Sequence, residues 1–151
     1  MTSRKISTVL FGALATFTLL GSVAPLAQAD QPAAPDSKDG YELKVDKPAS
    51  VKAGQEATFT VNLKSKGPWH INQEFPTKVQ LKEVAGVTFP KKKLTKADAA
   101  KFSEKEAEFK VPFNVAAKGA KTIESELVFS VCIESQCSRV KEKVKVAVTA
   151  K

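Results

Sequence analysis

Residues 129 to 140 read Phe129-Ser130-Val131-Cys132-Ile133-Glu134-Ser135-Gln136-Cys137-Ser138-Arg139-Val140. Only four residues separate the two cysteines of this stretch, and apolar residues alternate with polar ones around them. Alternation with period two predicts half-buried strands, and so short a separation requires the chain to turn between them. The stretch therefore predicts an antiparallel hairpin that carries both cysteines beside its turn.

The register of this hairpin brings the two cysteines together. If the turn is centred on Glu134 and Ser135, Cys132 faces Cys137 directly. The Cα atoms of a non-hydrogen-bonded antiparallel pair are about 4.5 Å apart, which a disulfide can span. A four-residue loop with the cysteines at its mouth is an equal alternative, because Glu-Ser lacks the Asn-Gly chemistry of a type I′ turn. Both turns keep the cysteines adjacent, so we expect a disulfide.

The same register makes predictions further along both strands. On the cysteine face it sets opposite charges across from each other, in the pairs Glu126–Lys143 and Glu124–Lys145. On the other face, which must be the core, it sets apolar residues together, in the pairs Phe129–Val140 and Ile123–Val146. Leu127 opposite Glu142 is the exception, and there we expect a bulge or a local shift of register.

The chemistry of the predicted disulfide has two readings. Because side chains alternate between the two faces of a strand, both sulfurs are expected on the polar face. Arg139 lies on the same face, and its positive charge would favour a thiolate. Closing a loop of four intervening residues removes little entropy from the unfolded chain, so the bond is expected to stabilise the fold only slightly. The residues alone leave open both an exchangeable redox pair and a structural clip of the hairpin.

The N-terminus has the pattern of a secretory signal peptide. Arg4 and Lys5 precede a nearly continuous apolar run at 9–23, and Ala27-Gln28-Ala29 supplies a small-x-small cleavage site. The run is shorter than the ~20 residues of a membrane span. We therefore predict a signal peptide at 1–29, export to the periplasm (secretion if there is no outer membrane), and no stable membrane insertion after cleavage. In that oxidising compartment a cysteine pair is read first as a disulfide.

The remainder of the chain predicts one β domain. Residues 30–40 are rich in proline and polar side chains and predict a disordered leader. The domain at 41–151 shows seven or eight short strands, at 41–45, 57–63, 69–72, 79–82, 87–89, 107–113, 123–133 and 137–148. Short strands with turn signals at this spacing favour an immunoglobulin-like antiparallel β-sandwich, with an antiparallel barrel as the alternative.

Three smaller features qualify this pattern. Residues 52–55 have the composition of a turn. Pro112 places its strand at a sheet edge or introduces a bulge, because proline cannot donate to the ladder. Residues 96–101 are the helix-friendly patch of the sequence and can supply at most a turn or two.

Composition excludes several functions. The chain has 24 basic and 16 acidic residues and a formal charge of +8, but its lysines are spread along the strands, as on solvated faces and protected sheet edges. Nucleic-acid binding needs a clustered basic surface with aromatic residues, and Lys91-Lys92-Lys93 is too short to supply one. Two cysteines and one histidine leave a zinc site one ligand short. No nucleophile motif or phosphate loop is present, so we expect no cofactor and no resident metal.

Two aromatic residues beside each other have structural and functional readings. Trp69 is expected to anchor the core or the edge of the sandwich. His70, the single histidine, is expected to be an ordinary strand residue; its alternatives are a group that contacts or tunes the cysteines, and a metal ligand.

Four short blocks of the sequence carry a family resemblance. They are Trp69-His70-Ile71-Asn72, Phe75-Pro76-Thr77-Lys78-Val79, Gly86-Val87-Thr88-Phe89-Pro90, and Phe129-Ser130-Val131-Cys132 followed by Cys137. In this order they resemble the N-terminal periplasmic domain of the DsbD thiol:disulfide interchange proteins and its stand-alone relatives, over about residues 41–148. The resemblance implies an immunoglobulin-like sandwich in which Cys132 and Cys137 form a redox-active pair.

The function implied by the resemblance is thiol–disulfide interchange. Electrons would pass between this domain and thioredoxin-fold periplasmic proteins or a membrane thiol reductase, which we expect to be separate chains. Two alternatives remain: a non-catalytic secreted binding module whose disulfide only clips the hairpin, and a periplasmic Cu(I)-binding protein that uses Cys132, Cys137 and His70 in the reduced state.

Overall fold

The computed structural model describes residues 36–151. The predicted signal peptide and residues 30–35 of the predicted leader lie outside the described residues. Ten strands and two short 3-10 helices make up the described part, in the order η1 (Ser37–Gly40), β1 (Tyr41–Asp46), β2 (Glu56–Ser65), β3 (His70–Ile71), β4 (Lys78–Leu81), β5 (Val87–Thr88), β6 (Lys93–Thr95), η2 (Lys96–Asp98), β7 (Lys101–Phe102), β8 (Glu106–Val115), β9 (Gly119–Ile133) and β10 (Gln136–Ala150). None of the helices in this part is long and apolar enough to cross a membrane.

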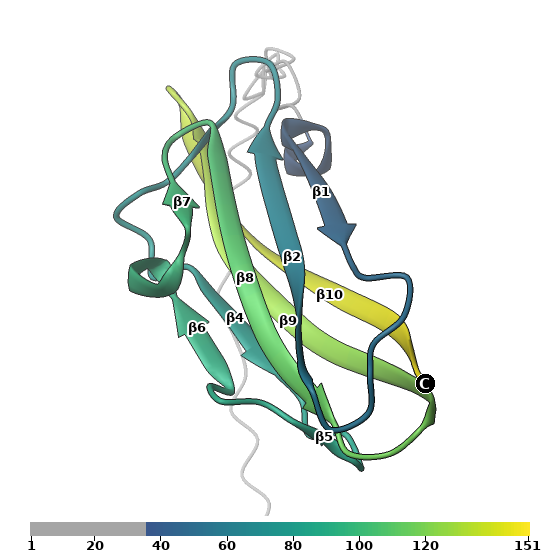
Figure 1. The fold of residues 1–151 in the computed structure, drawn as a ribbon. Helices are drawn as coiled ribbons and strands as arrows, with labels where there is room; N and C mark the ends of the chain where they lie inside the picture. Colours follow the sequence, from purple (N-terminus) through teal and green to yellow (C-terminus); the bar gives the residue numbers. More distant parts are fainter. Residues whose placement is uncertain (1–35) are drawn as a thin grey trace, which may run out of the picture. The chain divides into compact units, whose positions relative to one another are not determined.

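The strands form two antiparallel sheets of five strands each, packed as layers (Figure 1). In the first sheet the order is β1-β2-β8-β5, with β7 also paired to β8. In the second the order is β10-β9-β4-β6, with β3 also paired to β9. The predicted immunoglobulin-like antiparallel sandwich is therefore confirmed. The barrel alternative is wrong, because the strands divide into two sheets with free edges.

All eight predicted strand segments correspond to strands of the structure. The prediction missed β6 and β7, because strands of three and two residues are too short to show alternation. The helix-friendly patch at 96–101 forms one 3-10 turn, η2, whose N-terminus is closed by a reciprocal capping box between Thr95 and Asp98. The predicted turn at 52–55 is present, with Gly54 at a φ of 78° that favours glycine.

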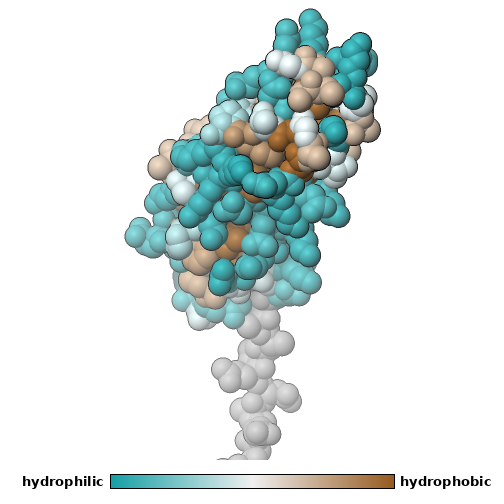
Figure 2. Space-filling view, turned by 90° about the horizontal axis from the view of Figure 1, so that it is seen from below, coloured by the Kyte–Doolittle hydropathy of each residue, from teal (hydrophilic) through white to brown (hydrophobic). Residues whose placement is uncertain are grey.

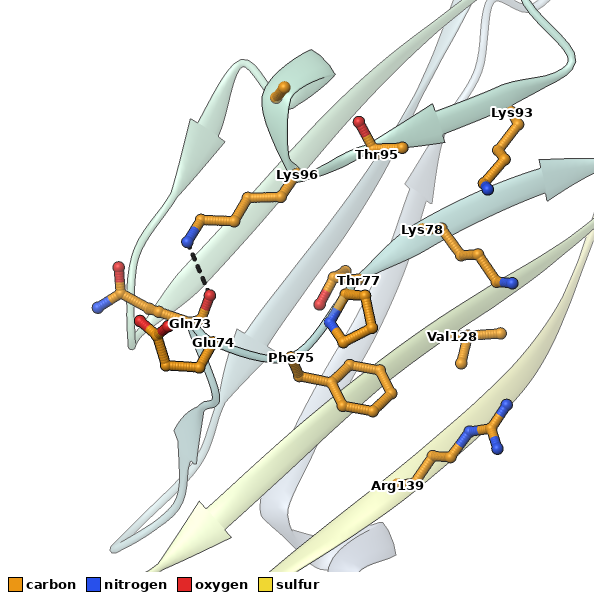
Figure 3. A pocket seen from close by; sticks show the side chains of 12 residues that line it. Gln73, Glu74, Phe75, Thr77, Lys78, Lys93, Thr95, Lys96, Val128 and Arg139 are labelled. Carbon is orange, nitrogen blue, oxygen red and sulfur yellow. Dashed lines mark hydrogen bonds between the residues drawn. The ribbon is translucent and has the colours of Figure 1, made fainter.

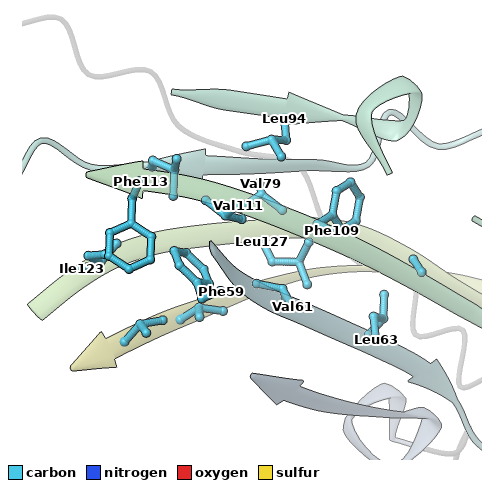
Figure 4. Packing of buried hydrophobic residues seen from close by; sticks show 14 of the residues in the cluster. Phe59, Val61, Leu63, Val79, Leu94, Phe109, Val111, Phe113, Ile123 and Leu127 are labelled. Atoms are coloured by element: carbon cyan, nitrogen blue, oxygen red, sulfur yellow. The ribbon is translucent and has the colours of Figure 1, made fainter. Parts of the chain in front are cut away.

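The core lies between the two sheets and is built from alternate residues of the long strands (Figure 4). Its largest fully buried side chains are Phe59, Phe109, Phe113 and Phe129. The rings of Phe59 and Phe113 contact each other across β2 and β8, with centroids 5.8 Å apart. Since successive strand residues point to opposite faces, this core fixes which side chains of β9 and β10 point outward.

The bulge predicted at Leu127 and Glu142 is absent. The β9–β10 ladder runs in one register from Ile133–Gln136 to Gly119–Ala150. Glu142 stays in register on the inner face because the hydroxyl of Tyr41, on the opposite sheet, donates a hydrogen bond to its carboxylate. Tyr41 also packs edge-on against the ring of Phe129, with centroids 4.9 Å apart. An acidic residue on the core face is thus accommodated by a partner and not by a shift of the strand.

The consequence predicted for Pro112 is confirmed in part. Strand β8 pairs with β2 without a break, and Pro112 lies opposite Thr58 in that ladder. On its other side β8 pairs only at its ends, with β7 at residues 107–108 and with β5 at residues 114–115. Pro112 therefore lies in a segment with one free edge, where the missing N–H costs no ladder hydrogen bond.

The last residues of the predicted leader form a capped 3-10 turn against Trp69. Asp36 caps the 3-10 helix η1, and Gly40 at its end is buried. A Cβ on Gly40 would lie 2.6 Å from the Cγ of Trp69, so only glycine allows this contact. Trp69 is 3 % exposed and belongs to the core cluster, which confirms its predicted role as an anchor.

Lysines and acidic residues cover the outward faces. The end of the sandwich seen in Figure 2 is mostly hydrophilic, with hydrophobic residues emerging in small patches. Ion pairs such as Lys44–Glu42 and Lys101–Glu106 are largely solvent-exposed, and solvent screening leaves such pairs with little effect on stability. The positive charge of the chain is therefore mainly a solvated surface, as its lysine spacing predicts.

Candidate functional site

A disulfide joins Cys132 and Cys137 across the hairpin of β9 and β10. The two residues are direct cross-strand partners, with Cα atoms 4.0 Å apart. This short distance is that of a non-hydrogen-bonded pair. The predicted register and the predicted disulfide are both confirmed.

The hairpin closes through a two-residue turn at Glu134 and Ser135. Ile133 and Gln136 on either side are already paired, so the alternative four-residue loop is wrong. The long uninterrupted ladder and the disulfide next to the turn hold this geometry without Asn-Gly. Turn preference is a local effect, and here it is outweighed by pairing along the whole hairpin.

The two cysteines lie on the outer face of the sheet but differ in exposure. Cys132 is 4 % exposed, whereas Cys137 is exposed. Cys132 lies on β9, which has neighbours on both sides, and Cys137 lies on β10, the edge strand. Parity thus predicts the correct face for both sulfurs, but it misses the burial of Cys132, which depends on the strand order of the sheet.

His70 is brought beside the disulfide. It begins β3 and pairs with Cys132 on the side of β9 opposite to Cys137. Directly opposite residues of antiparallel strands share one face, so His70, Cys132 and Cys137 form a cross-strand row on the outer face. Within residues 36–151 no group of three or more His, Cys, Asp or Glu side chains is arranged to hold a metal ion.

The predicted charge pairs on the cysteine face are confirmed in register and altered in detail. Lys145 Nζ lies 3.2 Å from a carboxylate oxygen of Glu124. Glu126 pairs with Lys141 at 3.4 Å and not with Lys143, which is directly opposite it. Hydrogen bonds from Lys82 and Lys145 lower the pKa of Glu124. The diagonal contact between Lys141 and Glu126 is within reach because the lysine side chain is long.

Residues 72–77 form a loop that interrupts the strand beside β9. Both β3 and β4 pair with β9, but in registers that differ by four residues, and the surplus chain folds away from the sheet. Asn72 holds the start of this loop, because its amide N–H donates to Ser130 O and its side-chain oxygen accepts from the N–H of Glu74. Lys96 of η2 donates to Gln73 O at 2.7 Å.

The loop borders a cavity of about 600 Å³ over the outer face of the second sheet (Figure 3). Phe75 and Val128 supply apolar surface to it, and Lys78, Lys93 and Arg139 supply positive charge. Arg139 pairs with Ser130 on β9, two residues from the disulfide along each strand. The cavity and the disulfide therefore occupy the same face of the sheet.

The sequence analysis did not identify this cavity. One signal was present: Val128 is apolar at a position whose parity assigns it to the polar face, and it is 2 % exposed. An apolar residue on such a face indicates that another segment covers it. The covering segment could not be identified from sequence, because the loop at 72–77 is positioned by two strand registers and not by a motif of its own.

Comparisons with known proteins add little beyond the fold class. No family model matches the sequence, and no curated protein matches it. Similar solved structures include AggA, the major subunit of aggregative adherence fimbriae type I from Escherichia coli, with 13% identity, a TM-score of 0.40 and coverage of 74% of this chain and 94% of that one. Domains 4 and 5 of the S-layer protein SbsC give 23% identity, a TM-score of 0.36 and coverage of 72% and 44%. The human CEP192 PapD-like domain 7 gives 9% identity, a TM-score of 0.37 and coverage of 85% and 98%. At these scores the three structures carry no functional argument.

Proposed function

We propose that this chain is a periplasmic thiol–disulfide exchange domain that passes electron pairs between thioredoxin-fold partners through Cys132 and Cys137. One observation carries the proposal: the disulfide lies on the outer face of the sheet, with an exposed cysteine on an edge strand and a buried one beside it. Unequal access is what a two-step exchange requires, because one sulfur must meet the partner and the other must resolve the intermediate.

The proposed exchange begins at Cys137. A thiolate of a reduced partner attacks the Cys137 sulfur, a mixed disulfide forms, and the intramolecular S–S bond breaks with its electron pair going to the Cys132 sulfur. The partner's second thiolate then attacks the sulfur of the partner cysteine that is bonded to Cys137. The mixed disulfide breaks and Cys137 leaves as a thiolate. The partner ends as a disulfide and this domain as a dithiol, so two electrons have been transferred. Reduction of a second partner is the same sequence reversed.

Two cationic or ionisable side chains support this chemistry. Arg139 lies two residues from Cys137 on the same face, and a nearby cation stabilises a thiolate. His70 lies in the cross-strand row with Cys132, the residue whose sulfur is the leaving group. Both residues are positioning residues in this proposal, since neither takes part in the bonds that form and break.

Sequence features support the cellular setting. The signal-peptide pattern at 1–29 fits export to the periplasm, and the order of the four blocks that resemble the DsbD N-terminal domain fits interchange chemistry. The short loop closed by the bond also argues against a purely structural disulfide, because a disulfide stabilises a fold least when it closes few residues.

Trapping of a mixed disulfide tests the proposal. Cys132→Ser leaves the exposed Cys137 thiol and removes the second sulfur of this domain. The partner is a thioredoxin variant that keeps only its attacking cysteine, activated as a mixed disulfide with thionitrobenzoate. The Cys137 thiolate should displace thionitrobenzoate and accumulate a covalent adduct visible on a non-reducing gel, because neither protein retains a thiol that can resolve it. Cys137→Ser is the matched control, and its buried Cys132 should form far less adduct. Equal adduct formation by the two variants, or none by either, would contradict the proposal. The second outcome would favour a non-catalytic module with a structural clip.

A further inference from the structure

We propose that the cavity over the outer face of the second sheet binds an acidic peptide segment of a partner protein, with an apolar side chain of that segment seated against Phe75 and Val128. This inference goes beyond redox exchange and does not require the disulfide to react. The cavity is bordered by the loop at 72–77, by β6 and by the outward side chains of β4, β9 and β10 (Figure 3). Its volume of about 600 Å³ suits a few side chains and lies within the range of ligand pockets.

The charge of the cavity is unbalanced. Lys78, Lys93 and Arg139 line it, and none of them has a carboxylate within ion-pair distance in the described part of the chain. In Figure 3 Lys78 and Arg139 lie on either side of Val128 and Lys93 lies beyond Lys78, while the acidic lining residue, Glu74, lies at the other end beside Gln73. Elsewhere on the same sheet face, Lys82, Lys141 and Lys145 are paired with glutamates.

The floor of the cavity is apolar where the rest of the face is polar. Val128 lies directly opposite Lys78 in the β4–β9 ladder, so an apolar surface and a cation adjoin. The ring of Phe75 lies beside Val128 in the same view (Figure 3). An isolated inorganic anion would leave this apolar surface unused, and a purely apolar ligand would leave the cations unpaired.

A buried hydroxyl at the cavity is also without a partner. Thr77 is 1 % exposed and lines the cavity, and its Oγ1 has no hydrogen-bond partner among the described residues. Buried polar side chains usually have a partner. Because Thr77 Oγ1 is closed off from solvent in the free protein, its side chain must rotate before a peptide carbonyl or carboxylate can accept a hydrogen bond from it. Charge, apolar surface and an unused donor together fit an acidic peptide with an apolar side chain.

Fluorescence polarisation with a defined probe tests this inference. The probe is a short fluorescein-labelled peptide in which aspartate and leucine alternate, and the protein is the mature chain with its disulfide intact. Saturable binding is expected, and it should weaken as salt is raised. Lys78→Ala combined with Lys93→Ala should weaken binding about five- to thirtyfold. Lys64→Ala combined with Lys118→Ala removes the same charge away from the cavity and should leave affinity within about twofold.

Further measurements distinguish binding at this cavity from non-specific charge attraction and from disulfide exchange. Replacing aspartate by lysine, or leucine by serine, in the probe should abolish or weaken binding. Thr77→Val should raise the melting temperature of the free protein and lower its affinity for the probe. A variant with both cysteines replaced by serine should still bind, so loss of exchange activity and loss of docking are distinguishable. No saturable binding, or equal weakening by the two lysine pairs, would overturn the proposal.

Discussion

The hydrogen bond between Tyr41 and Glu142 provides a direct test of how the two sheets are held together. Tyr41→Phe removes only the hydroxyl, because phenylalanine keeps the edge-on contact with Phe129. Glu142 then keeps its inward position without its donor. A hydrogen bond to a charged acceptor contributes about 1.5–3 kcal/mol, and Tyr41 is only 9 % exposed, so water replaces the lost donor poorly. We therefore expect a loss of about 1.5–3 kcal/mol, which is a fall in Tm of roughly 5–15 °C.

Urea unfolding followed by the fluorescence of Trp69 measures this loss, since the single tryptophan is buried. Glu142→Leu and the double variant complete a double-mutant cycle, in which the two changes should be coupled by about 1 kcal/mol or more. Phe and Leu together leave neither partner unpaired, so the double variant should be more stable than the sum of the single effects indicates. A cost below about 0.5 kcal/mol for Tyr41→Phe, or strict additivity, would refute the reasoning.

The same bond has a signature at high pH. Burial, followed by the hydrogen bond to Glu142, raises the pKa of Tyr41 above its ordinary value. A group whose pKa is raised by folding adds stability that is present below its unfolded pKa of about 10. That stability is lost as the pH rises through the folded value. Tyr41→Phe should lack this alkaline loss, and unfolding curves of both proteins above pH 10 measure the difference.

Three further substitutions test the packing and the cap. Gly40→Ala should cost about 1–3 kcal/mol, because its Cβ would lie 2.6 Å from the ring of Trp69, and urea unfolding with a shifted Trp69 emission would report it. Ser125→Ala should raise stability by about 1 kcal/mol, because the Ser125 hydroxyl is buried in the core without a hydrogen-bond partner among the described residues; a lower Tm would contradict this. A hydrogen bond from Lys91 lowers the pKa of Asp98 to about 2, below its unfolded value of about 3.9, so the stability it adds is present above pH ~4 and lost as the pH falls toward 2. Asp98→Asn should reduce stability at pH 7 and flatten that acid loss in a pH series of thermal melts.

The hairpin could be predicted closely from sequence because its determinants are local. Four residues between Cys132 and Cys137 leave few registers, and the alternation of Phe129 and Val131 with polar neighbours selects one face as core. The same local rule failed at Glu142, where it predicted a bulge. The residue that accommodates Glu142 is Tyr41, on the other sheet and about a hundred positions away in sequence, and no local pattern reports it.

The surroundings of the disulfide depend on strand order, which alternation does not specify. The exposure of Cys137 and the burial of Cys132 follow from β10 being an edge strand and β9 an internal one. The position of His70 beside Cys132 and the loop that borders the cavity follow from the pairing of β3 and β4 with β9. The sequence could therefore identify the cysteines as the candidate site but not the residues that surround them.

The reduction potential of the Cys132–Cys137 disulfide tests the central proposal most directly. Equilibration of the protein in dithiothreitol or glutathione redox buffers, followed by alkylation of free thiols and mass spectrometry, measures it. An exchange domain should have a potential in the range of its thioredoxin-fold partners, about −120 to −270 mV. A potential below about −300 mV, which is typical of structural disulfides, would contradict the account and identify the bond as a clip of the hairpin.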